Sequence, residues 1–182
     1  KPNNTDVEAH FWVMRITHIT LALFTFFSTY AYSNEECDIL ASLEADPSSV
    51  SSPVAFTDIQ SSSVIYACSK AIVRNDEAKP RFLLQRARGY LKGGESKKAL
   101  LDLEHAHKLG YPAATFGLAT AYFLGDDVAQ DLNKARQFFI LSYENGVLWS
   151  AQGLSLLYGN EMYEDYDLEK AKKWEARFKD GY

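Results

Sequence analysis

The chain has 182 residues, of which 24% are charged and 47% are apolar, so it is long enough for one domain with a sizeable core and its composition excludes a disordered chain. The formal net charge is −5. The sequence contains no basic stripe that could displace counterions from phosphates, which argues against a general nucleic-acid-binding protein. We expect most charges to lie on the solvated faces of helices.

Residues 1–33 are predicted to be a short upstream segment followed by a secretory signal peptide. Met14-Arg15 precedes an uncharged stretch rich in Leu, Phe and Thr, and Ala31-Tyr32-Ser33 resembles an A-x-A cleavage site. The apolar run is about 15 residues, which is short for a helix that spans a bilayer. We expect translation to start at Met14 and no stable membrane span to remain after cleavage. An uncleaved anchor is the alternative.

The remaining chain contains two cysteines, Cys37 and Cys68. An even number of cysteines in an exported protein favours a disulfide, so we predict that these two residues pair. Two unpaired, hydrophobic thiols are the alternative. Because there is no Cys-x-x-Cys motif, zinc and thioredoxin-like redox sites have no support.

Residues 34–79 are predicted to form an N-terminal region with a long loop. A short helix is expected over residues 35–43. Residues 45–63 contain seven serines and two prolines, which compete with regular backbone hydrogen bonding. Apolar residues at helical spacing then predict a helix from about Asp58 to Arg74. The apolar residues expected to anchor the loop against the first helices are Val54, Phe56 and Ile59.

Residues 80–182 are predicted to form six further helices of two alternating types, which we call inner and outer. Pro80 and Asp131 suit helix N-termini, whereas Gly93, Gly110 and Gly125 are typical stop signals. The expected inner helices cover residues 80–92, 112–124 and 149–158. The expected outer helices cover residues 95–109, 131–145 and 167–179.

One dipeptide recurs in the outer helices at a spacing of 36 residues, as Lys98-Ala99, Lys134-Ala135 and Lys170-Ala171. A fixed period of this length indicates one supersecondary unit stacked on copies of itself. Each unit alone leaves an apolar face bare, and stacking buries that face. A tyrosine near the end of each inner helix is expected to fill the gap at the turn with its hydroxyl at the wet edge, at Tyr90, Tyr122 and Tyr158.

These features resemble the Sel-one-like repeat, a longer-looped relative of the tetratricopeptide repeat, as found in exported bacterial proteins. The second unit reads Leu118-Ala119, Tyr122, Gly125, Asp131, Lys134-Ala135 and Phe138. The third reads Leu154-Ser155, Tyr158, Gly159, Asp167, Lys170-Ala171 and Trp174. The first unit, with a short turn at Gly94-Glu95, is closer to a tetratricopeptide repeat.

The resemblance covers residues 80–182 and implies three repeats in an all-α fold, a right-handed α-solenoid of stacked antiparallel helix pairs. Arg86 is a departure, because such repeats usually have leucine at this position. The resemblance also implies a groove lined by the inner helices. The groove positions are Arg81, Leu84, Arg88, Lys92, Phe116, Thr120, Phe123, Trp149, Gln152 and Leu156.

Such a groove would be basic at one end and aromatic at the other. It would suit an extended peptide with an acidic side chain or a terminal carboxylate. The alternative is that Phe116, Phe123 and Trp149 are ordinary packing residues.

The sequence contains no motif for nucleophilic catalysis, phosphate binding or a zinc protease. His105 and His107 are two residues apart on a predicted helix and therefore point in different directions. We expect no enzymatic activity, cofactor or metal site.

The resulting hypothesis is a periplasmic or secreted scaffold that binds a protein or peptide partner in the cell envelope, as an adaptor or regulator of signalling or complex assembly. Its alternatives are an enzyme acting on cell-wall peptidoglycan and a regulatory module of such an enzyme.

Overall fold

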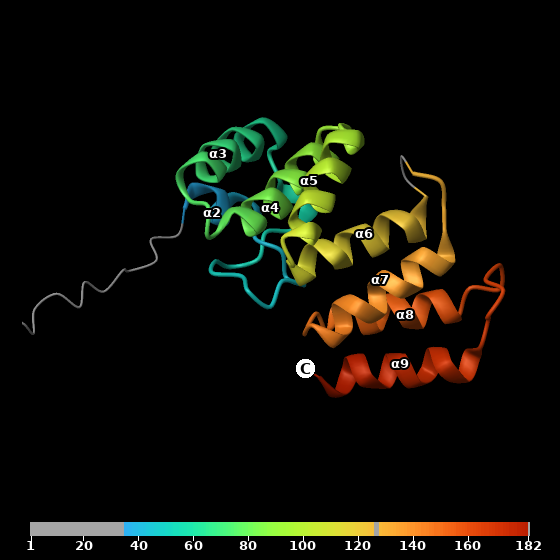
Figure 1. Cartoon of the computed structure of the whole chain (residues 1–182). Helices are drawn as coiled ribbons and strands as arrows, with labels where there is room; N and C mark the ends of the chain where they lie inside the picture. Colours follow the sequence, from blue (N-terminus) through green and yellow to red (C-terminus); the bar gives the residue numbers. More distant parts are fainter. Residues whose placement is uncertain (1–34, 126–127, 182) are drawn as a thin grey trace, which may run out of the picture. The chain divides into compact units, whose positions relative to one another are not determined.

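The computed structural model describes residues 35–125 and 128–181, and this part of the chain is helical and contains no strand, which confirms the all-α class (Figure 1). The predicted signal peptide lies outside the described residues. The N-terminal elements are α2 (Glu36–Ala41), the 3-10 helix η1 (Phe56–Asp58) and α3 (Ser61–Arg74). The inner helices are α4 (Lys79–Lys92), α6 (Pro112–Leu124) and α8 (Trp149–Tyr158). The outer helices are α5 (Ser96–Lys108), α7 (Leu132–Glu144) and α9 (Leu168–Asp180).

The helix ends follow their local sequence signals. The carboxylate of Asp131 accepts a hydrogen bond from the backbone N–H of Lys134 and so caps α7, as predicted. Gly125 has a φ of 76°, a left-handed conformation that favours glycine at a helix C-terminus. Helix α3 begins at Ser61 rather than near Asp58, because residues 56–58 form η1 instead.

Each helix packs mainly against its neighbours in the chain, and α4 also contacts α6, as α6 contacts α8. In Figure 1, α7, α8 and α9 run side by side, in agreement with these contacts. The inner helices therefore touch one another in sequence order.

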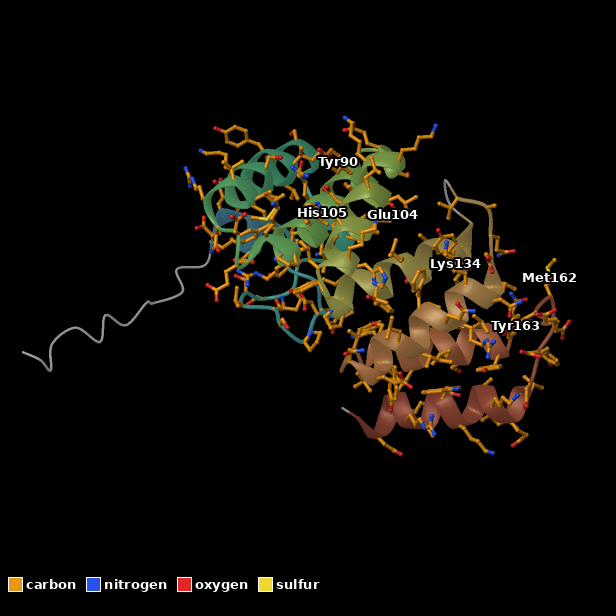
Figure 2. All side chains as sticks on the ribbon, viewed as in Figure 1. Tyr90, Glu104, His105, Lys134, Met162 and Tyr163 are labelled. Carbon is orange, nitrogen blue, oxygen red and sulfur yellow. A yellow bond between two sulfur atoms is a disulfide. The ribbon has the colours of Figure 1, made fainter. Side chains whose placement is uncertain are left out.

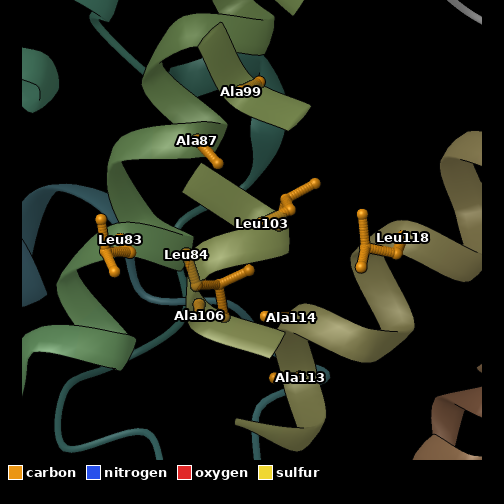
Figure 3. Close-up of a cluster of buried hydrophobic side chains, with 9 residues drawn as sticks. All are labelled: Leu83, Leu84, Ala87, Ala99, Leu103, Ala106, Ala113, Ala114 and Leu118. Carbon is orange, nitrogen blue, oxygen red and sulfur yellow. The ribbon is translucent and has the colours of Figure 1, made fainter. Parts of the chain in front are cut away.

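Small residues allow the helices to approach closely. Ala87 of α4 and Ala99 of α5 are completely buried, within a cluster that also receives Leu118 from α6 (Figure 3). Burying one leucine side chain contributes about 2 kcal/mol. The alanines of the other two Lys-Ala dipeptides, Ala135 and Ala171, are buried in the next cluster along the chain.

Glycines on two inner helices lie close to a side chain of the preceding outer helix. A Cβ built at Gly117 would lie 2.9 Å from Cδ2 of Leu103 on α5, and one at Gly153 would lie 2.6 Å from Cζ of Phe139 on α7. These two pairs are offset from each other by the 36-residue period seen in the sequence.

The tyrosines and lysines of the sequence pattern also meet in space. In each case the lysine Nζ of the outer helix lies near the ring of the inner-helix tyrosine. The distances to the ring centres are 5.5 Å for Lys98 and Tyr90, 4.0 Å for Lys134 and Tyr122, and 5.3 Å for Lys170 and Tyr158. Cation–π contacts of this kind stabilise the turn between two helices.

A disulfide joins Cys37 of α2 to Cys68 of α3, with a Cα–Cα distance of 4.7 Å, and confirms the predicted pairing. Both cysteines are completely buried, within a cluster that includes Phe82 of α4. The disulfide thus ties the N-terminal helix to the rest of the fold.

Candidate functional site

The groove positions predicted on α4 contact the chain's own N-terminal region. We call residues 42–60, between α2 and α3, the α2–α3 segment; Figure 1 shows it in cyan next to α4. Arg88, Lys92 and Arg81 all bind groups in α2 or in this segment, and Leu84 is buried with only 2% of its surface exposed.

Arg88 fixes the base of the α2–α3 segment. Its guanidinium donates hydrogen bonds to the carbonyls of Ala41, Ser42 and Val54 at 2.8, 2.6 and 2.7 Å. The N–H of Val54 in turn donates to the Ser42 carbonyl at 2.9 Å, which closes residues 43–53 into a loop. Burial lowers the pKa of Arg88 to about 10, so the side chain is still protonated at neutral pH. Its charge is therefore balanced by backbone carbonyls, including those at the C-terminus of α2.

A second group of polar contacts holds α2 and the loop. Arg81 makes a two-point salt bridge to Asp38 at 2.8 and 3.1 Å, and Gln85 donates to the same carboxylate. The Tyr111 hydroxyl at the start of α6 donates to Asp46 at 2.6 Å. Burial raises the pKa of the Asp46 carboxyl, and the Tyr111 hydrogen bond offsets part of this effect.

Phe56 does not anchor the segment, contrary to expectation. It is 48% exposed, because η1 buries none of its residues. Val54 does pack against the N-terminal core, and Ile59 is almost completely buried. The Nζ of Lys92 lies 5.4 Å from the Phe56 ring centre and donates to the Thr57 carbonyl at 3.0 Å.

The groove positions on α6 and α8 contribute to local packing. Phe116 and Phe123 lie 5.9 and 6.3 Å, between ring centres, from Phe139 of α7. Trp149 makes an edge contact with Phe178 of α9 at 5.4 Å.

Gln152 and Leu156 line a cavity of about 390 Å³ between α8 and α9. Thr120 donates to the Phe116 carbonyl and lines a different cavity. The ten predicted positions therefore do not form one continuous open surface in the described part of the chain.

A mostly apolar cavity of about 650 Å³ lies between α4, α5 and α6. We call it the inner cavity. Leu91 and Leu124 at its rim are 42% and 55% exposed. Its apolar lining includes Phe56, Leu91, Leu100, Leu103 and Leu124, and Ser96 and Thr120 are among its polar lining residues.

Of the ten predicted groove positions, Thr120 lines the inner cavity, whereas its leucines Leu91 and Leu124 were not among the predicted positions. Leu91 directly precedes the predicted groove position Lys92, and Leu124 directly follows the predicted groove position Phe123. A leucine near the end of an amphipathic helix gives no signal that distinguishes a cavity rim from a core position.

A shallower and more polar hollow of about 670 Å³ lies between the loops that follow α6 and α8. Figure 2 labels Met162 and Tyr163 in the second of these loops and Lys134 on α7. Asn133, in the first turn of α7, donates to Glu164 at 2.5 Å and accepts from the Tyr163 hydroxyl at 3.2 Å, so these contacts join the start of α7 to the loop that follows α8.

Within residues 35–125 and 128–181, no cluster of three or more His, Cys, Asp or Glu side chains could hold a metal ion. The same residues include no helix with the length and apolar character needed to cross a bilayer. Comparison of the chain with models of protein families, with curated proteins and with solved structures finds no match.

Proposed function

We propose that this chain is an exported helical-repeat protein that binds an extended segment of a protein partner through the inner cavity. The proposal includes three Sel-one-like or tetratricopeptide-like units stacked as a right-handed solenoid. It is supported by contacts that recur every 36 residues, such as Gly117 with Leu103 and Gly153 with Phe139.

The observation that carries the proposal is the inner cavity itself. Its walls are mostly apolar, and two of its leucines, Leu91 and Leu124, are 42% and 55% exposed. Exposed apolar groups that line a concave site are typical of a surface that buries a partner's side chain. Two hydroxyl-bearing residues, Ser96 and Thr120, line it, and the Thr120 hydroxyl is engaged with the Phe116 carbonyl. Because the rest of the lining is mostly apolar, the site favours an apolar side chain over a polar one.

The chain's own α2–α3 segment indicates what kind of backbone this region accepts. Arg88 and Lys92 hold the segment through the carbonyls of Val54 and Thr57, which are three residues apart. Binding through main-chain carbonyls does not depend on the side chains of the bound segment. We therefore propose that the partner segment also offers main-chain carbonyls, that it is extended, and that it places one large apolar side chain in the adjoining cavity.

The buried disulfide supports an extracytoplasmic location, because disulfides persist in oxidising compartments. A role in the cell envelope, as an adaptor or regulator of a protein complex, is part of the proposal.

The test uses a phage-displayed library of random peptides, selected on the folded chain. We expect enriched peptides that share a large apolar residue. Leu124→Asp, which places a charge at the cavity rim, should weaken their binding at least about tenfold because a carboxylate is costly to desolvate.

Leu101→Asp is the matched control. Leu101 is 65% exposed on α5 and does not line the cavity, so this change should leave binding unaltered. Equal binding of the enriched peptides to both variants, or no enrichment at all, would contradict the proposal.

A further inference from the structure

Residues 55–58 lie between two anchored residues, and Lys92 also contacts the span from α4. On one side, Val54 is fixed by Arg88 and by the Ser42 carbonyl. On the other side, Ile59 is only 1% exposed and packs in the N-terminal core. The four residues between these anchors are all exposed. This short span can therefore change its position without unpacking either anchor.

Phe56 lies in this span and borders the inner cavity. About half of its surface is exposed at the cavity rim, although a phenyl ring in this position could bury that surface against a ligand. The contacts that keep it there come from Lys92, whose ammonium bonds to the Thr57 carbonyl and lies near the Phe56 ring. The hydrogen bond from the Asp58 N–H to the Ala55 carbonyl, 3.0 Å long, closes the turn.

We infer that residues 55–58 form a flap, and that Phe56 closes it over an apolar side chain bound in the inner cavity. The bound side chain lies between the Phe56 ring on one side and Leu91 and Leu124 on the other. Closure buries the half of the Phe56 ring that is now exposed. In the free protein, the Lys92 contacts with Thr57 and Phe56 keep the flap close to its closed position. This inference rests on the proposed function, because it assigns a moving part to the same cavity.

The flap gives the site a specificity that rigid walls alone would not provide. An aromatic ring packs well against aliphatic and aromatic groups, whereas a charged group would have to lose its water against it. Within the extended protein segment of the proposed function, the flap therefore selects a leucine-sized or larger apolar side chain.

The test measures binding of the uncharged apolar dye Nile red to the full chain by fluorescence titration. The wild type is expected to bind one dye molecule. Leu124→Asp should abolish this binding because it alters the cavity itself. Phe56→Ala should weaken it about fivefold, as expected for the loss of one aromatic contact. Ile39→Ala, an exposed residue of α2 that does not line the cavity, is the matched control and should have no effect.

A second readout follows the motion of the flap. Hydrogen exchange of the Asp58 amide should slow when the dye is bound to the wild type. In Lys92→Met the same amide should exchange faster in the free protein, while the unfolding midpoint remains close to that of the wild type.

The outcomes separate the inference from the function on which it rests. If the wild type does not bind the dye, or if Leu124→Asp binds it normally, the cavity is not a binding site and both proposals fail. If Leu124→Asp abolishes dye binding but Phe56→Ala does not weaken it, the inference of a flap is wrong, whereas the proposal that the inner cavity binds a ligand is retained. Unchanged Asp58 exchange on dye binding would also overturn the flap.

Discussion

Gly153 of α8 lies directly against the ring of Phe139 on α7, so closely that a Cβ at position 153 would be 2.6 Å from Cζ of the phenyl ring. Phe139 is only 2% exposed and cannot move aside into solvent. The absent side chain therefore lets the inner helix α8 approach the preceding outer helix. The pair Gly117 and Leu103 does the same between α6 and α5.

Gly153→Ala is expected to destabilise the protein by about 2 kcal/mol, as overpacking does in a filled core. A loss of stability would be informative, because helix propensity alone predicts a gain: alanine is ordinarily a better helix former than glycine by about 1 kcal/mol. The measurement is the free energy of unfolding in urea, followed by circular dichroism.

The double variant Gly153→Ala with Phe139→Leu tests the cause. Replacing the ring by a smaller side chain makes room for the new methyl group, so adding Gly153→Ala to Phe139→Leu should cost much less than adding it to the wild type. If Gly153→Ala lowers the free energy of unfolding by the same amount in the wild type and in Phe139→Leu, the contact with the Phe139 ring is not the cause of the destabilisation.

Arg88→Met is expected to lower the free energy of unfolding by about 3 kcal/mol, because it removes the guanidinium hydrogen bonds from three buried or partly buried main-chain carbonyls. Arg88→Lys retains the charge but cannot reach the same set of carbonyls. Its free energy of unfolding should therefore lie between those of the wild type and Arg88→Met. Arg74→Met, at an exposed arginine on α3, is the control and should cost little. If Arg88→Met lowers the free energy of unfolding no more than Arg74→Met does, Arg88 does not hold the α2–α3 segment in place.

Arg88 also shows how far sequence reasoning reached and where it ended. The resemblance to the repeat units predicted that Arg81, Arg88 and Lys92 share one face of the first inner helix, and all three do contact α2 or the α2–α3 segment. The sequence could not indicate that the chain's own α2–α3 segment contacts this face. That contact depends on where a Ser- and Pro-rich loop closes, and such a loop has no periodicity from which its path can be predicted.

Arg86 is a similar case. The repeat pattern expects leucine at this position, and nothing near it in the sequence explains an arginine. In the structure, Arg86 makes two hydrogen bonds, 2.7 and 2.8 Å long, to Asp102 on the adjacent outer helix and another to Ser69 on α3. The helix boundaries were predictable because caps and glycines are local signals, whereas the partner of a buried charge is set by tertiary packing.

Asp46→Asn should change how stability depends on pH. Burial raises the pKa of Asp46 in the folded protein above its ordinary value of 3.8. The folded state therefore favours the protonated carboxyl, and the stability that this group contributes below pH 3.8 is lost as the pH rises through the folded pKa. Asparagine does not ionise, so the variant should gain stability relative to the wild type over this interval.

The measurement is the unfolding free energy of both proteins from about pH 3.5 to about pH 6, an interval that begins near the unperturbed value for aspartate. Asp180→Asn, at an exposed carboxylate near the end of α9, is the control. A difference between Asp46→Asn and the wild type that stays constant across the interval would show that Asp46 does not titrate differently in the folded protein.

Removing the disulfide should cost about 3 kcal/mol of unfolding free energy, because a cross-link that closes a loop of roughly 30 residues restricts the unfolded chain. The double variant Cys37→Ser with Cys68→Ser is compared with the oxidised wild type in urea. Because Cys37 lies on α2, which directly precedes the α2–α3 segment, the loss should also appear as faster exchange of the Val54 amide, which bonds to Ser42. Mass spectrometry of the unreduced protein after alkylation provides the control, with neither cysteine expected to be modified. Two alkylated thiols in that sample would exclude the disulfide, and a Val54 amide unaffected by its loss would show that α2 does not hold the segment in place.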